Sequence, residues 1–297
     1  MGTAGADAVV VPMSEVTVRI PASTSNIGPG FDCMGIALAL YNTMTVARAD
    51  GPLPVSPPHD MIAAAANLFF QRTGLAPFAF RWHVTGEVPS GRGLGSSVTL
   101  RLGVLAALDE LTGRPLGRDG IFRLGHELEG NPDNAAPSTF GGFVLTDARG
   151  ACFRFEVAPQ LQFVLLIPAL EILTGEARRV LPASISHRDA VINSGNACMI
   201  TAAFATQQYE KLRGCFGDAL HQPHRAHLVP GFHAIIAAGE KAGALGGFLS
   251  GSGSTVCCVT LANADPVAAA MLAAWPGPAP ALVRVVTADN EGLHILR

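Results

Sequence analysis

The chain has 297 residues, of which 49% are hydrophobic and 14% are charged, and its formal net charge is −3. This composition is typical of a globular protein and excludes a disordered or coiled-coil chain. Because the charge is nearly balanced and no basic stripe is found, the sequence predicts no nucleic-acid partner. It favours a small-molecule ligand.

The use of lysine and cysteine excludes further classes. Only Lys211 and Lys241 are lysines, so a site with a lysine beside a glycine loop, as in Walker A proteins and protein kinases, is nearly excluded. The 6 cysteines form no CxxC pair and predict no disulfide framework. No window approaches the ~18 apolar residues of a membrane span, and the apolar run Ala8–Val11 is too short for a signal peptide. We therefore expect a cytoplasmic protein with no membrane partner.

The hydrophobic pattern of the first half predicts strands and helices in alternation. The stretch from Gly93 to Thr112 is the clearest helix, because Val98 and the leucines at 94, 102, 105 and 108 recur at three- and four-residue spacings, and Gly113 is its expected C-terminal cap. The loop PASTSNIGPGFDCMG is expected to interrupt the first strand, and the prolines at 52, 54, 57 and 58 predict an open connection. The other predicted elements are strands at 15–20, 36–48 and 79–88 and helices at 61–71 and 120–128.

The second half repeats the alternation without an internal sequence repeat. We predict strands at 143–146, 152–157, 162–168, 255–261 and 281–287, and helices at 190–212, 232–241 and 266–275. The pattern indicates an α+β or α/β protein with a domain boundary near residue 150.

A glycine-rich loop, PSGRGLGSS from Pro89 to Ser97, lies between a predicted strand and the clearest helix. Glycines allow backbone N–H groups to approach an anion, and a helix N-terminus favours negative charge, so the loop suits a phosphate. When this loop is considered alone, a tight strand-to-helix turn with Ser96 or Ser97 as the helix N-cap explains its glycines equally well. The spacing matches neither a Walker A nor a Rossmann motif.

Two more polar, glycine-rich segments lie at the ends of predicted strands: Pro21–Asp32 and Gly246–Val256. A fourth polar segment, EGNPDN from Glu129 to Asn134, adds two carboxylates and two side-chain amides. A single loop of this kind is usually a turn, but several in one chain suggest one composite binding site.

These segments, in this order, resemble the signature motifs of the GHMP small-molecule kinases, a family named after galactokinase, homoserine kinase, mevalonate kinase and phosphomevalonate kinase. Within the family, the blocks are most similar to those of homoserine kinases. The similar blocks are PASTSNIGPGFDCMGIALALYN, PSGRGLGSSVT, EGNPDNAAPSTFGGF, ILTGEARRVLP, DALHQPHRAHLVPG and GGFLSGSGSTV. Together they span roughly residues 15–292.

The resemblance implies a two-domain α+β fold with an N-terminal domain like S5 domain 2 and a ferredoxin-like C-terminal domain. The expected ATP-binding domain spans residues 1–155 and the second domain 156–297. The implied activity is ATP-dependent phosphorylation of the homoserine side-chain hydroxyl, with Mg²⁺ as cofactor. A homodimer is compatible with the family.

The resemblance also assigns site residues. ATP is expected to contact Pro89, Gly91, Arg92, Gly93, Leu94, Gly95, Ser96, Ser97, Gly251 and Gly253. The metal is expected on Ser97 and Glu127, with Glu129 as the alternative carboxylate. Catalytic roles fall on Asp133, Asn134, Arg178 and Arg225, and substrate contacts on Asn26, Asp32, Asn131 and Thr174.

The charges of these residues suit an amino acid. Guanidinium groups bind a carboxylate, which fits Arg178 and Arg225, whereas Asp32 and Asp133 suit an ammonium and a hydroxyl. We interpret the neighbouring Arg179 as a surface charge. The HxxHxxH motif of His221, His224 and His227 is not expected to bind a metal, because Pro223 disrupts a helical arrangement of its histidines.

The sequence departs from the family pattern in three places, one of which covers two residues. Asn131 stands where a histidine is usual, Ser254 where a proline is usual, and Val98 with Thr99 where two alanines are usual. Because Asn131 is implied to lie beside the substrate, two alternatives stay open: a kinase for another small hydroxylated substrate such as threonine, and a non-catalytic nucleotide-binding relative.

Overall fold

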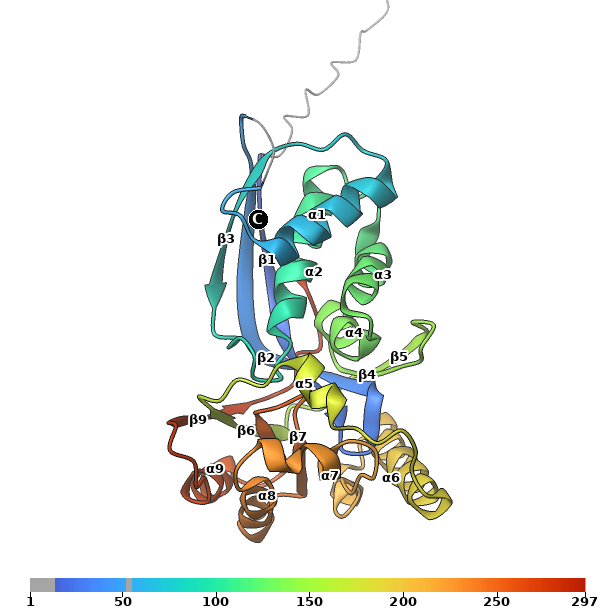
Figure 1. Cartoon of the computed structure of the whole chain (residues 1–297), viewed down its shortest axis with the longest axis vertical. Coiled ribbons are helices and arrows are strands. Elements are labelled where there is room, and N and C mark those ends of the chain that lie inside the picture. The colour runs from blue at the N-terminus through green and yellow to red at the C-terminus, as the bar shows by residue number, and fades with distance from the viewer. Residues whose placement is uncertain (1–13, 52–54, 297) are drawn as a thin grey trace, which may run out of the picture.

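The computed structural model describes residues 14–51 and 55–296, so the Ala8–Val11 run and two of the expected connecting prolines, at 52 and 54, lie outside it. Each half of the molecule has its own sheet and its own helices, and one half is stacked on the other (Figure 1). No helix of the described residues is long and apolar enough to cross a membrane. The α+β class expected from the sequence is confirmed.

The first half is an antiparallel sheet in the order β10-β1-β2-β4-β5, with β3 paired to β2. Its strands are β1 (Glu15–Ile27), β2 (Gly30–Arg48), β3 (Phe80–Gly86), β4 (Phe143–Thr146), β5 (Cys152–Phe155) and β10 (His294–Leu296). Its helices are α1 (Asp60–Thr73), α2 (Ser96–Leu111), α3 (Gly117–Glu129) and α4 (Pro132–Phe140). The apolar side chains that gave α2 its periodicity, including Val98, Leu102 and Leu105, are buried in the core between helices and sheet.

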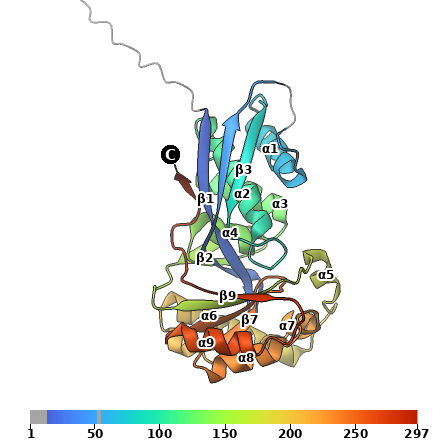
Figure 2. The same cartoon turned by 90° about the vertical axis from the view of Figure 1, so that its left-hand side faces the viewer.

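The second half is an antiparallel sheet in the order β7-β8-β6-β9, with α8 and α9 packed along it (Figure 2). Its strands are β6 (Gln162–Pro168), β7 (Gly246–Leu249), β8 (Val256–Thr260) and β9 (Ala281–Val286). Its helices are α5 (Thr174–Arg179), α6 (His187–Ala205), α7 (Gln222–Arg225), α8 (Phe232–Lys241) and α9 (Ala264–Ala273), with 3₁₀ turns at Tyr209–Leu212 and Ala226–Leu228.

A shared apolar core joins the two halves. Phe143 of β4 stacks on Phe204 of α6 with ring centroids 4.2 Å apart, and both rings are fully buried. Phe163 of β6 belongs to the same buried cluster. Because burying aromatic rings is among the largest favourable terms in packing, this core fixes one half against the other.

The structure corrects the expectation that the first glycine-rich segment is an irregular loop. β1 continues through it to Ile27, and β2 begins at Gly30, so the segment is the far end of a long hairpin. Its polar side chains are buried because they find distant partners: the Thr24 hydroxyl lies 2.8 Å from that of Ser250, and the Ser23 hydroxyl donates to Asn134 over 3.0 Å. Such partners satisfy groups that would otherwise be costly to bury.

Other boundaries also differ from the expected ones. The expected helix at 190–212 is α6 followed by a separate 3₁₀ turn, the helix expected from Gly93 begins at Ser96, and Thr112 rather than Gly113 caps it. Strands β7 and β10 and helices α4, α5 and α7 were not expected. The division expected at 155/156 falls between β5 and β6, but β10 returns to pair with β1. The domain limits stay a prediction.

Candidate active site

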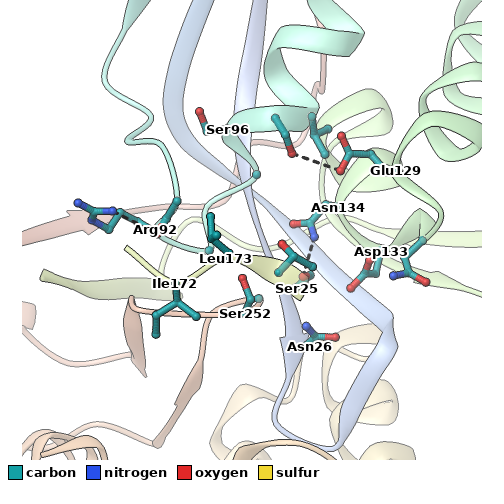
Figure 3. Close-up of a pocket in the computed structure, with 18 of the residues that line it drawn as sticks. Ser25, Asn26, Arg92, Ser96, Glu129, Asp133, Asn134, Ile172, Leu173 and Ser252 are labelled. Carbon is teal, nitrogen blue, oxygen red and sulfur yellow. Dashed lines mark hydrogen bonds between the residues drawn. The ribbon is translucent and has the colours of Figure 1, made fainter. Parts of the chain in front are cut away.

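A cavity of about 300 Å³ lies where the two halves meet, and the polar segments of the sequence converge on it (Figure 3). The expected site residues on its wall are Asn26, Asp32, Gly91, Arg92, Gly93, Gly95, Ser96, Ser97, Asn131, Asp133, Asn134, Thr174, Arg178, Arg225 and Gly251. Residues separated by more than 200 positions in the chain therefore line one cavity. The composite site expected from the sequence forms, although the binding roles of its residues remain predictions.

The Pro89–Ser97 loop forms one wall and leads into the N-terminus of α2. Gly91, Gly93 and Gly95 have φ angles of 65°, 71° and 71°, values that side chains with a Cβ rarely adopt. Four successive carbonyls of the loop, from Gly91 to Leu94, accept hydrogen bonds from Ile172, Thr255, Ser250 and Ser23.

These four hydrogen bonds also determine the direction of the amide N–H groups in the loop. In a trans peptide the N–H points away from the preceding carbonyl, so the N–H groups of residues 92–95 point away from those partners. The N-terminus of α2 begins immediately afterwards, at Ser96. An amide-lined loop followed by a helix N-terminus is suited to a phosphate group.

Three expected nucleotide contacts do not lie on the cavity wall. Leu94 is buried in the apolar core, and its carbonyl is held by the Ser23 N–H. Gly253 faces the side chains of Leu249 and Ile172, and Pro89 precedes the loop residues that line the cavity. The structure therefore places these three residues outside the wall, and their expected contacts with the nucleotide remain predictions.

The structure places the side chain of Glu127, the expected metal carboxylate, away from the cavity, and its metal role stays a prediction. Glu127 pairs with Arg72 on the surface, its side chain is 44% exposed, and it does not line the cavity. Glu129 lines the cavity instead, and its Oε2 accepts a hydrogen bond of 3.2 Å from the Ser97 hydroxyl. The two glutamates diverge because residues two apart on a helix point in different directions.

Glu129 is suited to a hard cation. Burial raises the pKa of its carboxyl, while Arg101 and the Ser97 hydroxyl oppose that rise. Arg101 binds Oε1, so Oε2 is the oxygen that faces Ser97. A hydroxyl oxygen beside a carboxylate oxygen, next to a phosphate-binding loop, is a ligand set that Mg²⁺ accepts.

Asp133 lies in the first turn of α4 and is 3% exposed. Burial, and then the charge of Asp32, raise the pKa of Asp133 to about 7, against the lowering effects of Ser25 and Arg178. Asn134 beside it donates to the Ser25 hydroxyl over 2.8 Å. A buried carboxyl with a pKa near neutrality, on the wall of a cavity, has the properties of a general base.

The raised pKa of Asp133 predicts a pH-dependent effect on stability. A folded-state pKa above the unfolded value of 3.8 means that the folded protein binds the proton more tightly, so stability is lost as pH rises through about 7. Asp133→Asn should therefore raise the melting temperature more at pH 8.5 than at pH 5, in the ligand-free protein. An equal effect at both pH values, by differential scanning fluorimetry, would contradict the raised pKa.

The two expected arginines lie on different elements but face one region. Arg178 of α5 makes a two-pronged ion pair with Asp32, with N···O distances of 2.8 and 3.1 Å. Arg225 of α7 is 1% exposed and donates to the carbonyls of Ala177 and Gly251. Burial, and then Arg178, lower the pKa of Arg225 to about 10, which still leaves it charged at neutral pH.

Asn131 also acts on Arg178. With its side-chain amide oriented to satisfy its neighbours, Asn131 donates to the Gly130 carbonyl and its amide oxygen accepts from Arg178. The residue therefore contacts the same guanidinium group that pairs with Asp32. The departure from histidine at this position supplies one acceptor to the arginine.

Sequence reasoning missed several residues of the wall, including Ser25, Met61, Glu171, Leu173 and Ser252. Ser25 belongs to a segment that was singled out, so its position was accessible from the sequence. The position of Glu171 was not accessible from the sequence, because this residue follows β6 and belongs to no motif. Its carboxyl group lies against Gly91 at the phosphate loop. No sequence pattern marked Met61 of α1.

The HxxHxxH histidines do not converge. His221 is fully buried and its Nε2 lies 2.8 Å from the Gly28 carbonyl, whereas His227 is exposed. Within residues 14–51 and 55–296, no group of three or more His, Cys, Asp or Glu side chains is arranged to hold a metal ion.

An α+β protein with two sheets and a glycine-rich loop opening a helix at the cavity between them has the architecture of a small-molecule kinase. Residues 60–142 match the model of the GHMP kinases N terminal domain, and residues 202–277 match that of the GHMP kinases C terminal. The chain belongs to the GHMP kinase family.

Curated relatives and a solved structure agree with this assignment. The chain is 38% identical to the homoserine kinase of Microchaete diplosiphon, over 96% of this chain and 98% of that one. It is 37% identical to the homoserine kinase of Carboxydothermus hydrogenoformans, over 81% and 84%. The crystal structure of homoserine kinase from Cytophaga hutchinsonii shares the fold, with a TM-score of 0.88 at 23% identity over 99% of this chain and 100% of that one. The two-domain fold expected from the resemblance is confirmed.

Proposed function

We propose that the protein transfers the terminal phosphoryl group of ATP to the side-chain hydroxyl of L-homoserine and forms O-phospho-L-homoserine. The observation that carries the proposal is the two-pronged Arg178–Asp32 ion pair beside the phosphate loop. A zwitterionic amino acid can exchange with this pair, its carboxylate at Arg178 and its ammonium at Asp32. The identity with two curated homoserine kinases supports the same substrate.

Phosphoryl transfer depends on positioning and charge neutralisation more than on covalent chemistry. In the proposal, the amides of residues 92–95 and the N-terminus of α2 bind the phosphates. Ser97 and Glu129 would hold Mg²⁺, and the bound ion would neutralise phosphate charge. Arg225 adds a buried positive charge at the substrate carboxylate.

Asp133 is the proposed partner of the reacting hydroxyl. It orients the hydroxyl and accepts its proton, because burial places its pKa near neutrality. Ser25 and Asn134 hold α4 against β1 and so fix the position of this carboxyl group. A cytoplasmic location and a homodimer remain predictions.

The proposed function is tested by measuring ADP release with homoserine, threonine, serine and mevalonate as acceptors, with MgATP at saturation. We expect turnover with homoserine to exceed turnover with each of the others, and to require Mg²⁺. Faster release with threonine or mevalonate would assign another substrate, and release with no acceptor would indicate only an ATPase.

Asn131→His provides a test of the departure nearest the substrate. Because Asn131 contributes an acceptor to Arg178, and a neutral histidine also offers one, we expect the kcat/KM ratio of homoserine over threonine to stay within a few-fold of its native value. A native ratio below one that the histidine reverses would show that Asn131 has redirected the site to another alcohol.

A further inference from the structure

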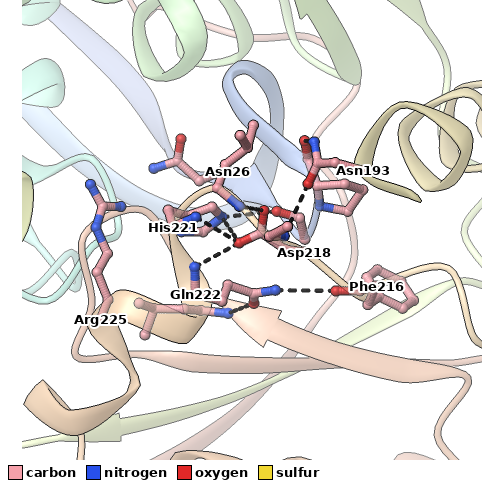
Figure 4. Close-up of polar contacts among 12 residues, drawn as sticks. Asn26, Asn193, Phe216, Asp218, His221, Gln222 and Arg225 are labelled. Atoms are coloured by element: carbon pink, nitrogen blue, oxygen red, sulfur yellow. Dashed lines mark hydrogen bonds and ion pairs between the residues drawn. The ribbon is translucent and has the colours of Figure 1, made fainter. Parts of the chain in front are cut away.

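A buried polar cluster connects α7, which carries Arg225, to the turn between β1 and β2, which lies next to Asn26 and Asp32 (Figure 4). Asp218 and His221 have side chains that are 0% exposed, and neither lines the active-site cavity. We define these two residues and Asn193 as the brace. Neither composition nor the HxxHxxH spacing assigned the brace a role.

The first part of the brace fixes α7. Oδ1 of Asp218 accepts the Leu220 N–H over 2.7 Å, and Oδ2 accepts those of His221 and Gln222 over 2.9 and 2.6 Å. A helix of one turn, such as α7, has little stability of its own, so its orientation depends on contacts of this kind. Asp218 thereby sets the direction of the helix that carries Arg225.

The second part fixes the β1–β2 turn. Nε2 of His221 donates to the Gly28 carbonyl over 2.8 Å, and Nδ2 of Asn193 donates to the Pro29 carbonyl over 3.0 Å. Burial lowers the pKa of His221, against the opposing charge of Asp218, which favours the neutral ring with its proton on Nε2. Asn193 also accepts the Ala219 N–H over 3.2 Å, so it joins the turn to the Asp218 segment.

The β1–β2 turn also determines where Asp32, the acidic residue of the proposed substrate site, lies. Asn26 and Asp32 flank it, and the Asn26 side chain accepts the Asp32 N–H over 2.8 Å. The ring of Phe31 stacks on His221 with centroids 5.2 Å apart, and its face lies 5.1 Å from the Arg225 guanidinium and 5.6 Å from that of Arg178. Movement of His221 would therefore displace both the β1–β2 turn and the Phe31 ring that the two guanidinium groups face.

From this geometry we infer that His221 and Asn193 are positioning residues that set the separation between the carboxylate-binding arginines and the ammonium-binding Asp32. The inference rests on the proposed function, since it presumes an amino-acid substrate that contacts both charges. A substrate with both charges is sensitive to the separation of their partners, whereas one with a single charge can adjust its position. Neither residue lines the cavity in which the substrate would bind.

Three acceptors distinguish positioning from a general structural role: homoserine, 4-hydroxybutanoate, which lacks the ammonium, and 3-amino-1-propanol, which lacks the carboxylate. In His221→Ala we expect the KM for homoserine to rise about 10- to 100-fold, from the loss of a buried hydrogen bond and a ring contact. The kcat/KM for the two singly charged acceptors should fall much less, and the KM for ATP should not change.

Two further variants complete the experiment. His221→Gln keeps an N–H donor near the position of Nε2 and should restore most of the homoserine affinity. Asn193→Ala should reproduce the His221→Ala pattern in smaller measure, and it keeps the inference testable if His221→Ala does not fold. An equal fold-loss of kcat/KM for all three acceptors would overturn the inference. A lowered melting temperature with an unchanged homoserine KM would overturn it as well. If native protein does not phosphorylate homoserine, the proposed function fails instead, and the two failures are distinguishable.

Discussion

Arg178→Ala should raise the KM for homoserine by tens- to thousands-fold while leaving ATP affinity nearly unchanged. Removing one partner of a close, desolvated charge pair costs ~2–5 kcal/mol, and each ~1.4 kcal/mol is a factor of ten. The Arg178 guanidinium is held between Asp32 and Asn131, so it is already oriented for a carboxylate. Steady-state kinetics for homoserine and a direct ATP-binding measurement separate the two affinities.

Arg179→Ala is the matched control, because Arg179 is the next residue of α5 and is exposed. It should leave both affinities near the native values. Arg225→Ala should act in the same direction as Arg178→Ala, with a loss of stability as well, since Arg225 is 1% exposed and bonded to two carbonyls. If ATP affinity fell as far as homoserine affinity in Arg178→Ala, its assignment to the substrate carboxylate would be wrong.

Glu129→Gln should reduce kcat by about 100-fold and raise the Mg²⁺ concentration needed for half-maximal rate, because a neutral amide is a weaker ligand for a hard cation. The Ser97 hydroxyl donates to Glu129, so Ser97→Ala should change the same two quantities in the same direction. A magnesium titration of the rate at saturating ATP and homoserine measures both.

Glu127→Gln provides a control two residues away in the same helix turn. Its carboxylate pairs with Arg72 at the surface, and exposed ion pairs contribute ~0–1 kcal/mol to stability. We expect native kinetics and a native magnesium requirement. A larger effect at Glu127 than at Glu129 would return the metal to the position that the resemblance favoured.

The polar loops could be recognised from the sequence because their chemistry is local. Glycines at 91, 93 and 95 adopt positive φ in the strand-to-helix loop where a phosphate was expected, and Asp133 lies on the cavity wall with Asn134. The α2 helix was equally accessible, since its apolar spacing reflects the face that it buries. These features depend on neighbours in the chain.

The features that sequence reasoning missed depend on distant contacts. The hairpin through Ser23–Ser25 is stable because Ser250 and Asn134 satisfy its hydroxyls, and both lie more than 100 residues away. The choice between Glu127 and Glu129 depends on the direction in which the end of α3 faces α2, which the spacing of acidic residues does not reveal. The brace at His221 was hidden for the same reason, since its partner carbonyl belongs to Gly28.

The central claim is that the cavity phosphorylates homoserine in preference to other hydroxyl amino acids. The most direct test supplies equal concentrations of homoserine and threonine with limiting MgATP, and measures both phosphorylated products by mass spectrometry. Their ratio equals the ratio of kcat/KM values, and we expect O-phosphohomoserine in at least about tenfold excess. Equal amounts of the two products, or an excess of phosphothreonine, would contradict the account.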